Sequence, residues 1–106
     1  MKTWIPLTAA GLMLLSQPVP AATRALLVGV SAYPKVSGVR PLQGPANDVG
    51  LLAGRLRDLG VKPVRVLSSN AMQEQDQPSH AAILAALQDT LGRSTKGDWV
   101  ILYFSG

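Results

Sequence analysis

The sequence predicts an α/β domain whose sheet is mostly parallel. Three short apolar runs, residues 24–30, 61–67 and 98–106, alternate with two segments whose apolar residues recur at helical spacing. Nearly continuous apolar runs of this length are typical of parallel strands, which are covered on both faces. The order β-α-β-α-β implies right-handed crossover connections between the strands.

The composition is that of one small globular domain. The chain has 106 residues, of which 47% are apolar and 15% charged. It has no cysteine, so the sequence holds no disulfide, no thiolate metal ligand and no cysteine nucleophile. Its ten lysines and arginines are scattered singly, which argues against a nucleic-acid-binding surface despite the net charge of +4.

The N-terminal segment has the layout of a secretory signal peptide. Met1-Lys2 gives a positive start, residues 4–15 are largely apolar, and the following residues are turn-prone and then small. We expect residues 1–22 to be a signal peptide, cleaved after Ala21 or after Ala22, and residues 23–106 to form the mature domain. The protein is then exported to a bacterial periplasm or to the extracellular space. An uncleaved anchor is the alternative, although the apolar segment is short for a membrane span.

The first apolar run, residues 24–30, predicts a central, buried strand. Residues 31–45 are interrupted by several glycines and prolines, which predict a loop. A loop of this length directly after a buried strand is more often functional than a passive connection.

A first helix is predicted from Asn47-Asp48 to about Leu59, with Gly60 ending it in a left-handed conformation. Its buried stripe consists of Val49, Leu52, Leu56 and Leu59. A second strand follows at residues 61–67, and residues 68–77 form a polar loop.

A second helix is predicted to begin at Pro78-Ser79, with Ser79 as its N-cap, and to end at Gly92. Its buried stripe consists of Ile83, Leu84, Leu87 and Leu91. The last run, residues 98–106, predicts a central strand that is buried on both faces and ends in Ser105-Gly106.

The end of this last strand is where a binding site is expected, because open α/β sheets bind ligands beyond the carboxyl ends of their strands. Three strands and two helices are too few to cover both faces of a parallel sheet. We therefore expect these residues to be part of a larger α/β domain. Taken alone, they leave the strand at 99–104 with an open edge, which favours aggregation.

Several common catalytic motifs do not occur. There is no G-x-G-x-x-G and no phosphate-binding G-x-x-x-x-G-K-[ST] sequence. His80, the single histidine, has no acidic residue or cysteine at ligand spacing and is expected on a helix surface. Ser105 is not surrounded by a G-x-S-x-G elbow, which argues against a serine nucleophile.

Asp48 has two interpretations. An acidic residue at a helix N-terminus caps free N–H groups and interacts favourably with the helix dipole. The loop before Asp48, however, lies at the same edge of the sheet as Ser105. A carboxylate at that edge could bind a cationic substrate group through charge-assisted hydrogen bonds.

Four stretches in order resemble the caspase-like cysteine peptidases, particularly metacaspases and their bacterial relatives. Residues 24–33 resemble the first strand and its exit, residues 42–49 (LQGPANDV) the family's L-x-G-[C/P]-x-N-D sequence, and residues 78–87 the second helix. Residues 97–106 (GDWVILYFSG) resemble the strand that leads into the family's S-G-H-G sequence. Together they span nearly all of the mature chain.

The resemblance implies a three-layer caspase-like (caspase-haemoglobinase) fold, of which this chain is the first β-α-β-α-β portion. It implies a cysteine-type endopeptidase whose catalytic histidine and cysteine both follow Gly106, so that residues 1–106 contain no catalytic residue and are inactive alone. A catalytically inactive caspase-like scaffold is the alternative function. An unrelated doubly wound domain that binds a small ligand is a third possibility.

The resemblance also implies substrate-binding roles. Asp48 and Ser105 match family residues that help form the pocket for the substrate's P1 side chain, which implies cleavage of protein substrates after Arg or Lys. Pro45 stands where many metacaspases have cysteine, so one wall of that pocket is altered. No cofactor is implied in this segment. Calcium activates some metacaspases, but its ligands are not expected among these residues.

Overall fold

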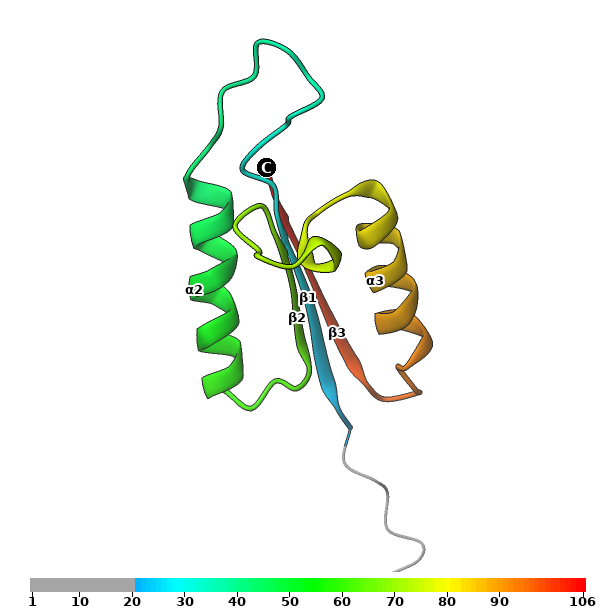
Figure 1. The fold of residues 1–106 in the computed structure, drawn as a ribbon. Helices are drawn as coiled ribbons and strands as arrows, with labels where there is room; N and C mark the ends of the chain where they lie inside the picture. Colours follow the sequence, from blue (N-terminus) through cyan, green and yellow to red (C-terminus); the bar gives the residue numbers. More distant parts are fainter. Residues whose placement is uncertain (1–20) are drawn as a thin grey trace, which may run out of the picture.

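A computed structural model describes residues 21–106. The expected signal peptide, residues 1–22, lies almost entirely outside the described residues. The elements follow one another in the predicted order (Figure 1): β1 (Thr23–Gly29), α2 (Gly44–Asp58), β2 (Val64–Ser68), the short 3-10 helix η1 (Glu74–Asp76), α3 (His80–Gly92) and β3 (Trp99–Ser105).

The three strands form one parallel sheet in the order β2-β1-β3. Leu26 of β1 lies opposite Arg65 of β2 and Leu102 of β3. α2 covers one face of the sheet and α3 covers the other, so the chain forms three layers (Figure 1). The predicted α/β class, the parallel sheet and the central position of β1 are confirmed.

The core between the sheet and α2 is built on β1. Alternate residues of a strand point to opposite faces, which places Ala25 and Leu27 on this side. They pack against Val49 and Ala53 of α2, and none of the four is more than 1% exposed. The prediction that Leu59 completes the buried stripe is wrong, because Leu59 follows the last residue of the helix and is 80% exposed.

The core on the opposite face consists of Leu26, Val28, Leu67 and Ala86. The predicted stripe of α3 is half right. Ile83 and Leu87 pack against this core, but Leu84 and Leu91 are exposed. The helix instead turns its small residues, Ala82 and Ala86, toward the sheet. Because these side chains are short, α3 packs through them and leaves the two larger leucines outside.

β3 differs from the prediction of a central strand buried on both faces. Ile101 and Tyr103 pack on the α2 side, whereas Trp99, Leu102 and Phe104 are exposed. The reason is that β3 lies at an edge of the sheet and α3 packs on β1 and β2. The open edge predicted for this strand is confirmed for the part of the chain that the structure describes.

α2 begins at Gly44, three residues before the predicted start. Pro45 is tolerated in the first turn because the first N–H groups of a helix have no partner within it. The predicted start at Asn47-Asp48 is therefore wrong. The other end is as predicted, with Gly60 at a φ of +89°.

β2 begins at Val64, not at residue 61. The backbone N–H of Val61 donates to the carbonyl oxygen of Leu56 (3.0 Å), so Val61 closes the end of α2 and does not join the sheet. α3 begins as predicted, since the Ser79 hydroxyl accepts a hydrogen bond from the N–H of Ala82 (3.1 Å). None of the helices within residues 21–106 has the length and apolar character needed to cross a membrane.

Candidate substrate-binding edge

The carboxyl ends of the three strands lie side by side at one end of the sheet (Figure 1). This end is here called the carboxyl edge; it is distinct from the open edges along the outer strands β2 and β3. Backbone hydrogen bonds continue slightly beyond the strands. The N–H of Val30 donates to the carbonyl of Ser105 (2.8 Å), and the N–H of Ser69 donates to that of Gly29 (3.2 Å). These bonds fix the positions from which each strand enters its loop.

Ser31 organises this edge and was not singled out in the sequence. It is 6% exposed. Its hydroxyl accepts from the N–H of Ala46 (2.9 Å), and its own N–H donates to the hydroxyl of Ser69 (2.9 Å). Ser31 thus joins the exit of β1 to the first turn of α2 and to the exit of β2. In the sequence, Ser31 is a small polar residue directly after a strand. Many loop residues fit this description, so the sequence does not distinguish Ser31 from them.

Gly29 allows α2 to begin directly against the end of β1. A Cβ atom at this position would lie 2.5 Å from the carbonyl oxygen of Pro45 and 2.9 Å from Cγ2 of Val49. Real Cβ atoms do not approach other atoms so closely, so only glycine fits without a shift of the helix. The absence of a side chain at Gly29 therefore allows the first turns of α2 to pack closely against the end of β1.

Asp48 is the fifth residue of α2, about 6 Å along the helix from its first residue at 1.5 Å per residue. Since the first turn contains no acidic residue and the N-cap is Gln43, the interpretation of Asp48 as a cap is wrong. Asp48 is exposed. Within residues 21–106, its carboxylate has no hydrogen-bond or ion-pair partner. Its oxygen Oδ2 lies 3.9 Å from where a Cβ of Gly44 would stand, so the carboxylate points back toward the start of the helix.

Ser105 lies on the same face of the sheet as α2. It pairs with Gly29, and Ile101 and Tyr103, two and four residues before it, pack on the α2 side. Ser105 is half-buried. The structure therefore places Asp48 and Ser105 at one edge and on one face of the sheet, and the first turns of α2 stand over that face.

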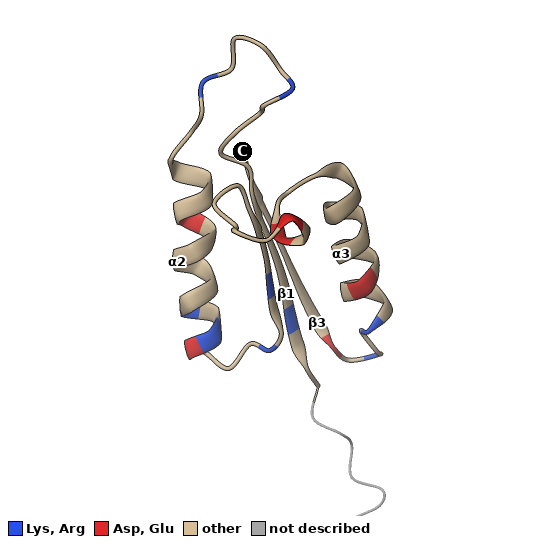
Figure 2. Cartoon of the chain, viewed as in Figure 1, with Lys and Arg blue, Asp and Glu red and all other residues tan. Residues whose placement is uncertain are grey.

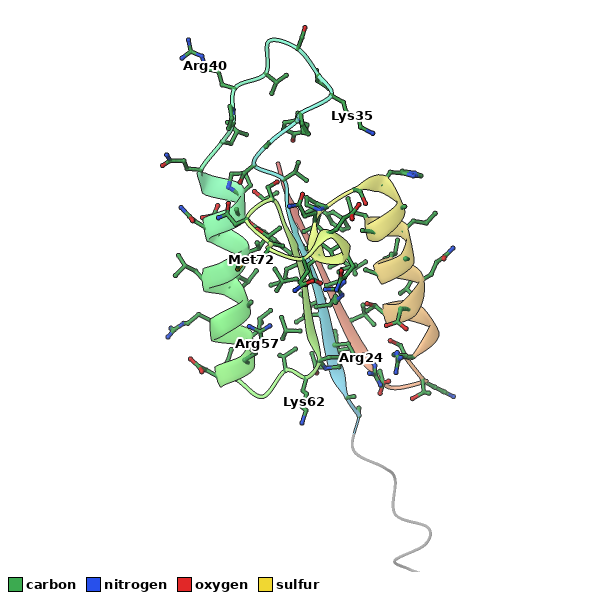
Figure 3. The ribbon with its side chains drawn as sticks, in the orientation of Figure 1. Arg24, Lys35, Arg40, Arg57, Lys62 and Met72 are labelled. Atoms are coloured by element: carbon green, nitrogen blue, oxygen red, sulfur yellow. The ribbon has the colours of Figure 1, made fainter. Side chains whose placement is uncertain are left out.

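The loop between β1 and α2 extends beyond this edge (Figure 3). It is largely exposed and carries two cations, Lys35 and Arg40, which point outward in Figure 3. Figure 2 shows no acidic residue in this loop. At its start, the Tyr33 hydroxyl oxygen lies 2.8 Å from where a Cβ of Gly106 would stand. Gly106 thus leaves the space that the tyrosine occupies.

A hollow of about 1080 Å³ lies between α2 and β2, away from Ser105. Asn47, Met72 and Asp76 are among the residues that line it, but Asp48 and Ser105 are not. Arg65 forms an ion pair with Asp76 and donates to the Gln75 carbonyl (3.1 Å), which fixes η1 beside β2. The hollow lies beside β2, the outer strand on the opposite side of the sheet from β3. It is not the predicted P1 pocket, because neither Asp48 nor Ser105 lines it.

His80 is the first residue of α3 and is exposed, which confirms its expected position on a helix surface. Among residues 21–106, no three His, Cys, Asp or Glu side chains are close enough to hold a metal ion. The chemically useful groups at the carboxyl edge are therefore one exposed carboxylate, several hydroxyls and the backbone of Ser105-Gly106.

Comparison with known proteins identifies the family. The family model described as the caspase domain matches residues 22–106, which is most of the chain and all but one of the described residues. A search of curated proteins finds no match. The match covers every strand and helix of the three layers described above. The chain therefore belongs to the caspase domain family, whose members are cysteine peptidases acting on protein substrates.

Proposed function

We propose that this chain supplies part of the P1 pocket of an exported cysteine endopeptidase that cleaves after Arg or Lys. The observation that carries the proposal is the Asp48 carboxylate. It is exposed, does not cap its helix, and lies on the same face and edge of the sheet as Ser105.

The chemistry of this carboxylate favours a cationic side chain. An ionised carboxylate is an acceptor only, and it binds guanidinium or ammonium groups through charge-assisted hydrogen bonds. The Ser105 hydroxyl, at the same edge and on the same face of the sheet, can accept one further N–H from a cationic side chain bound there. Lys35 and Arg40 on the long loop add positive charge outside the edge, which would favour substrates with acidic residues away from the cleaved bond.

Bond cleavage by a cysteine peptidase needs a cysteine and a histidine, whereas residues 1–106 contain no cysteine and their one histidine, His80, is exposed at the start of α3. In the proposal, a histidine directly after Gly106 and a cysteine on a later strand act as acid–base and nucleophile. β3 then holds the histidine at the carboxyl edge next to the pocket. Residues 1–106 alone should show no peptidase activity.

The test uses the full-length gene product and two matched variants of α2. Asp48→Asn removes the proposed pocket charge, and Asp58→Asn removes an exposed charge at the other end of the same helix. Because a hydrogen bond to a charged group contributes about 1.5–3 kcal/mol, we expect Asp48→Asn to lower kcat/KM for P1-Arg peptides by about 10- to 150-fold. Asp58→Asn should leave it unchanged.

Thermal unfolding distinguishes this role from a structural one. Both variants should unfold within about 0.5 kcal/mol of the wild type, because both positions are exposed. Equal losses of activity in the two variants, or a loss of stability that accounts for the loss of activity in Asp48→Asn, would contradict the proposal. A full-length protein that cleaves no peptide and does not react with a cysteine-directed peptidyl inhibitor would support the inactive-scaffold alternative.

A further inference from the structure

The amino end of the sheet holds a carboxylate against the backbone nitrogen of Ala22. The N–H of Ala22 donates to Oδ1 of Asp98 (3.0 Å), and the N–H of Trp99 donates to the carbonyl of Ala22 (2.9 Å). Ala22 therefore lies alongside β3 one residue before β1 begins. Figure 1 shows the chain reaching this end of the sheet opposite the carboxyl edge.

The Asp98 side chain is well enclosed, at 7% exposed. Its second oxygen, Oδ2, accepts from the N–H of Thr95 (2.9 Å) and from the Thr95 hydroxyl (3.3 Å). The backbone N–H groups of Thr95 and then of Ala22 lower the pKa of Asp98, so the group is ionised at neutral pH. Arg24 contributes charge only, since its buried Nε lies 3.9 Å from Oδ2 and makes no hydrogen bond.

We infer that signal peptidase cleaves the Ala21–Ala22 bond and that the new α-ammonium group of Ala22 forms an ion pair with Asp98. The inference rests on the proposed export of the protein, but not on its peptidase activity. Water adds across the peptide bond and the C–N bond breaks. Ala21 keeps the carboxylate, and the Ala22 amine takes up a proton, because its ordinary pKa is about 8.

The geometry selects one of the two bonds that the sequence left open. Cleavage after Ala21 keeps both the nitrogen that contacts Asp98 and the carbonyl that accepts from Trp99. Cleavage after Ala22 removes both groups and leaves Asp98 without its Oδ1 donor. Ala21 itself is exposed and makes no backbone hydrogen bond in the described part of the chain.

Cleavage also strengthens the contact. It replaces a neutral N–H donor by an ammonium group with three donors and a full charge. The other charged groups at this end are Arg24, Lys62, Lys96, the last turn of α2 with Arg55, Arg57 and Asp58, and an ion pair between Asp89 and Arg93 (2.8 Å). Asp89 is paired with Arg93, and Asp58 is exposed at the end of α2. Among the described residues, Asp98 is the carboxylate that contacts the Ala22 nitrogen. Asp98 is therefore the group that raises the pKa of the new amine.

The first measurement is the N-terminus of the protein secreted by a bacterial host from the full-length gene, by intact mass and terminal sequencing. We expect it to begin at Ala22. A mature protein that begins at Thr23, or one that retains residues 1–21, would overturn the inference. Neither result depends on peptidase activity, so failure here is separate from failure of the P1 proposal.

The second measurement is the pKa of that amine, from the pH dependence of its acylation by a small amine-selective reagent. We expect a value above the ordinary one, with acylation near pH 8 slowed about tenfold for each unit of the rise. Asp98→Asn should restore the ordinary value and Asp89→Asn should not. An ordinary pKa in the wild type would contradict the ion pair.

If Asp98→Asn does not fold, a protein that starts at Ala21 and keeps Asp98 replaces it as the control.

The ion pair also fixes the direction in which stability changes with pH. The folded-state pKa of the amine is raised, so its stabilisation is complete below about pH 7.7 and is lost as pH rises through the folded value. We expect this alkaline loss of Tm in the Ala22 form and not in the Ala21 form. An identical loss in both forms would overturn the inference.

Discussion

The two ends of the sheet are built differently. At the amino end, backbone groups are paired in close succession: Lys62 donates to Thr23, Ala25 to Pro63, and Ala22 and Thr95 both donate to Asp98. At the carboxyl edge, a long exposed loop leaves the sheet and the Asp48 carboxylate has no partner within residues 21–106 (Figure 3). The amino end thus pairs these backbone groups with one another and with Asp98, whereas the carboxyl edge leaves the Asp48 carboxylate available to a ligand.

This difference explains why the carboxyl edge needs its own supports. Loops that carry function are positioned by rigid elements beneath them. Here the supports are Gly29, which lets α2 begin at the end of β1, and Ser31, which ties α2 to both neighbouring strand exits. Changes to these two residues should therefore alter the carboxyl edge more than changes to exposed residues of the same type.

Gly29→Val should have the largest effect. Its Cβ would meet the Pro45 carbonyl at 2.5 Å and Val49 at 2.9 Å, so α2 must move away from β1. We expect a loss of about 3 kcal/mol or more in unfolding free energy, measured by urea denaturation of the full-length protein. Gly54→Ala is the matched control. A Cβ there meets nothing within 4 Å, and alanine should stabilise the helix by up to about 1 kcal/mol. A tolerated Gly29→Val would mean that α2 is not fixed by this contact.

Ser31→Ala should have the next largest effect. It leaves the buried N–H of Ala46 without its hydroxyl acceptor, which should cost about 1–3 kcal/mol. Ser37→Ala, in the exposed loop, should change stability by less than about 0.5 kcal/mol. In the full-length protein, we expect the Ser31 variant also to raise KM for P1-Arg peptides, because α2 carries Asp48. Equal stabilities of the two variants would remove Ser31 from the supports of this edge.

Ser79→Ala should cost about 1 kcal/mol, the usual contribution of an N-cap, because the N–H of Ala82 loses its acceptor. α3 packs on the face opposite α2, so KM should not change. Chemical denaturation and peptide kinetics on one preparation check both parts. A change in KM would show that the two faces are coupled.

Of these changes, Asp98→Asn should affect the carboxyl edge least, because Asp98 lies at the opposite end of the sheet. It should still lower stability at neutral pH, since asparagine keeps only one of the two oxygens that accept hydrogen bonds. The pKa of Asp98 is lowered in the folded protein, mainly by the N–H of Thr95. Its stabilisation is therefore complete above the unfolded value of about 3.9 and is lost as pH falls through the folded value. We expect Tm measured between pH 2 and pH 6 to fall less steeply in the variant. Parallel curves would show that Asp98 contributes nothing to acid stability.

The sequence predicted the order of the elements along the chain, the parallel sheet and the cap at Ser79, because these follow from the apolar pattern and from residue types at helix ends. It misplaced the start of α2, because Gly44-Pro45 has the composition of a loop and also that of a first helical turn. It could not show that Leu84 and Leu91 face outward, since α3 packs through alanines that carry little hydrophobic signal. The predicted burial of β3 was too high, because an apolar run does not show which elements pack on the strand. β3 is an outer strand, and α3 packs on β1 and β2 instead.

The site was predicted less completely than the fold. The position of Asp48 and Ser105 at one edge followed from topology alone. Ser31 and Gly29 could not be found, since their roles depend on contacts with Ala46 and Pro45, which the chain brings together only on folding.

Selectivity of the full-length protein for arginine over citrulline at P1 tests the role of Asp48 most directly, because these two side chains have a similar shape and differ in charge. We expect the ratio of their kcat/KM values to be large in the wild type and in Asp58→Asn, and to fall by about tenfold or more in Asp48→Asn. An unchanged ratio in Asp48→Asn would contradict the assignment of this carboxylate to the P1 pocket.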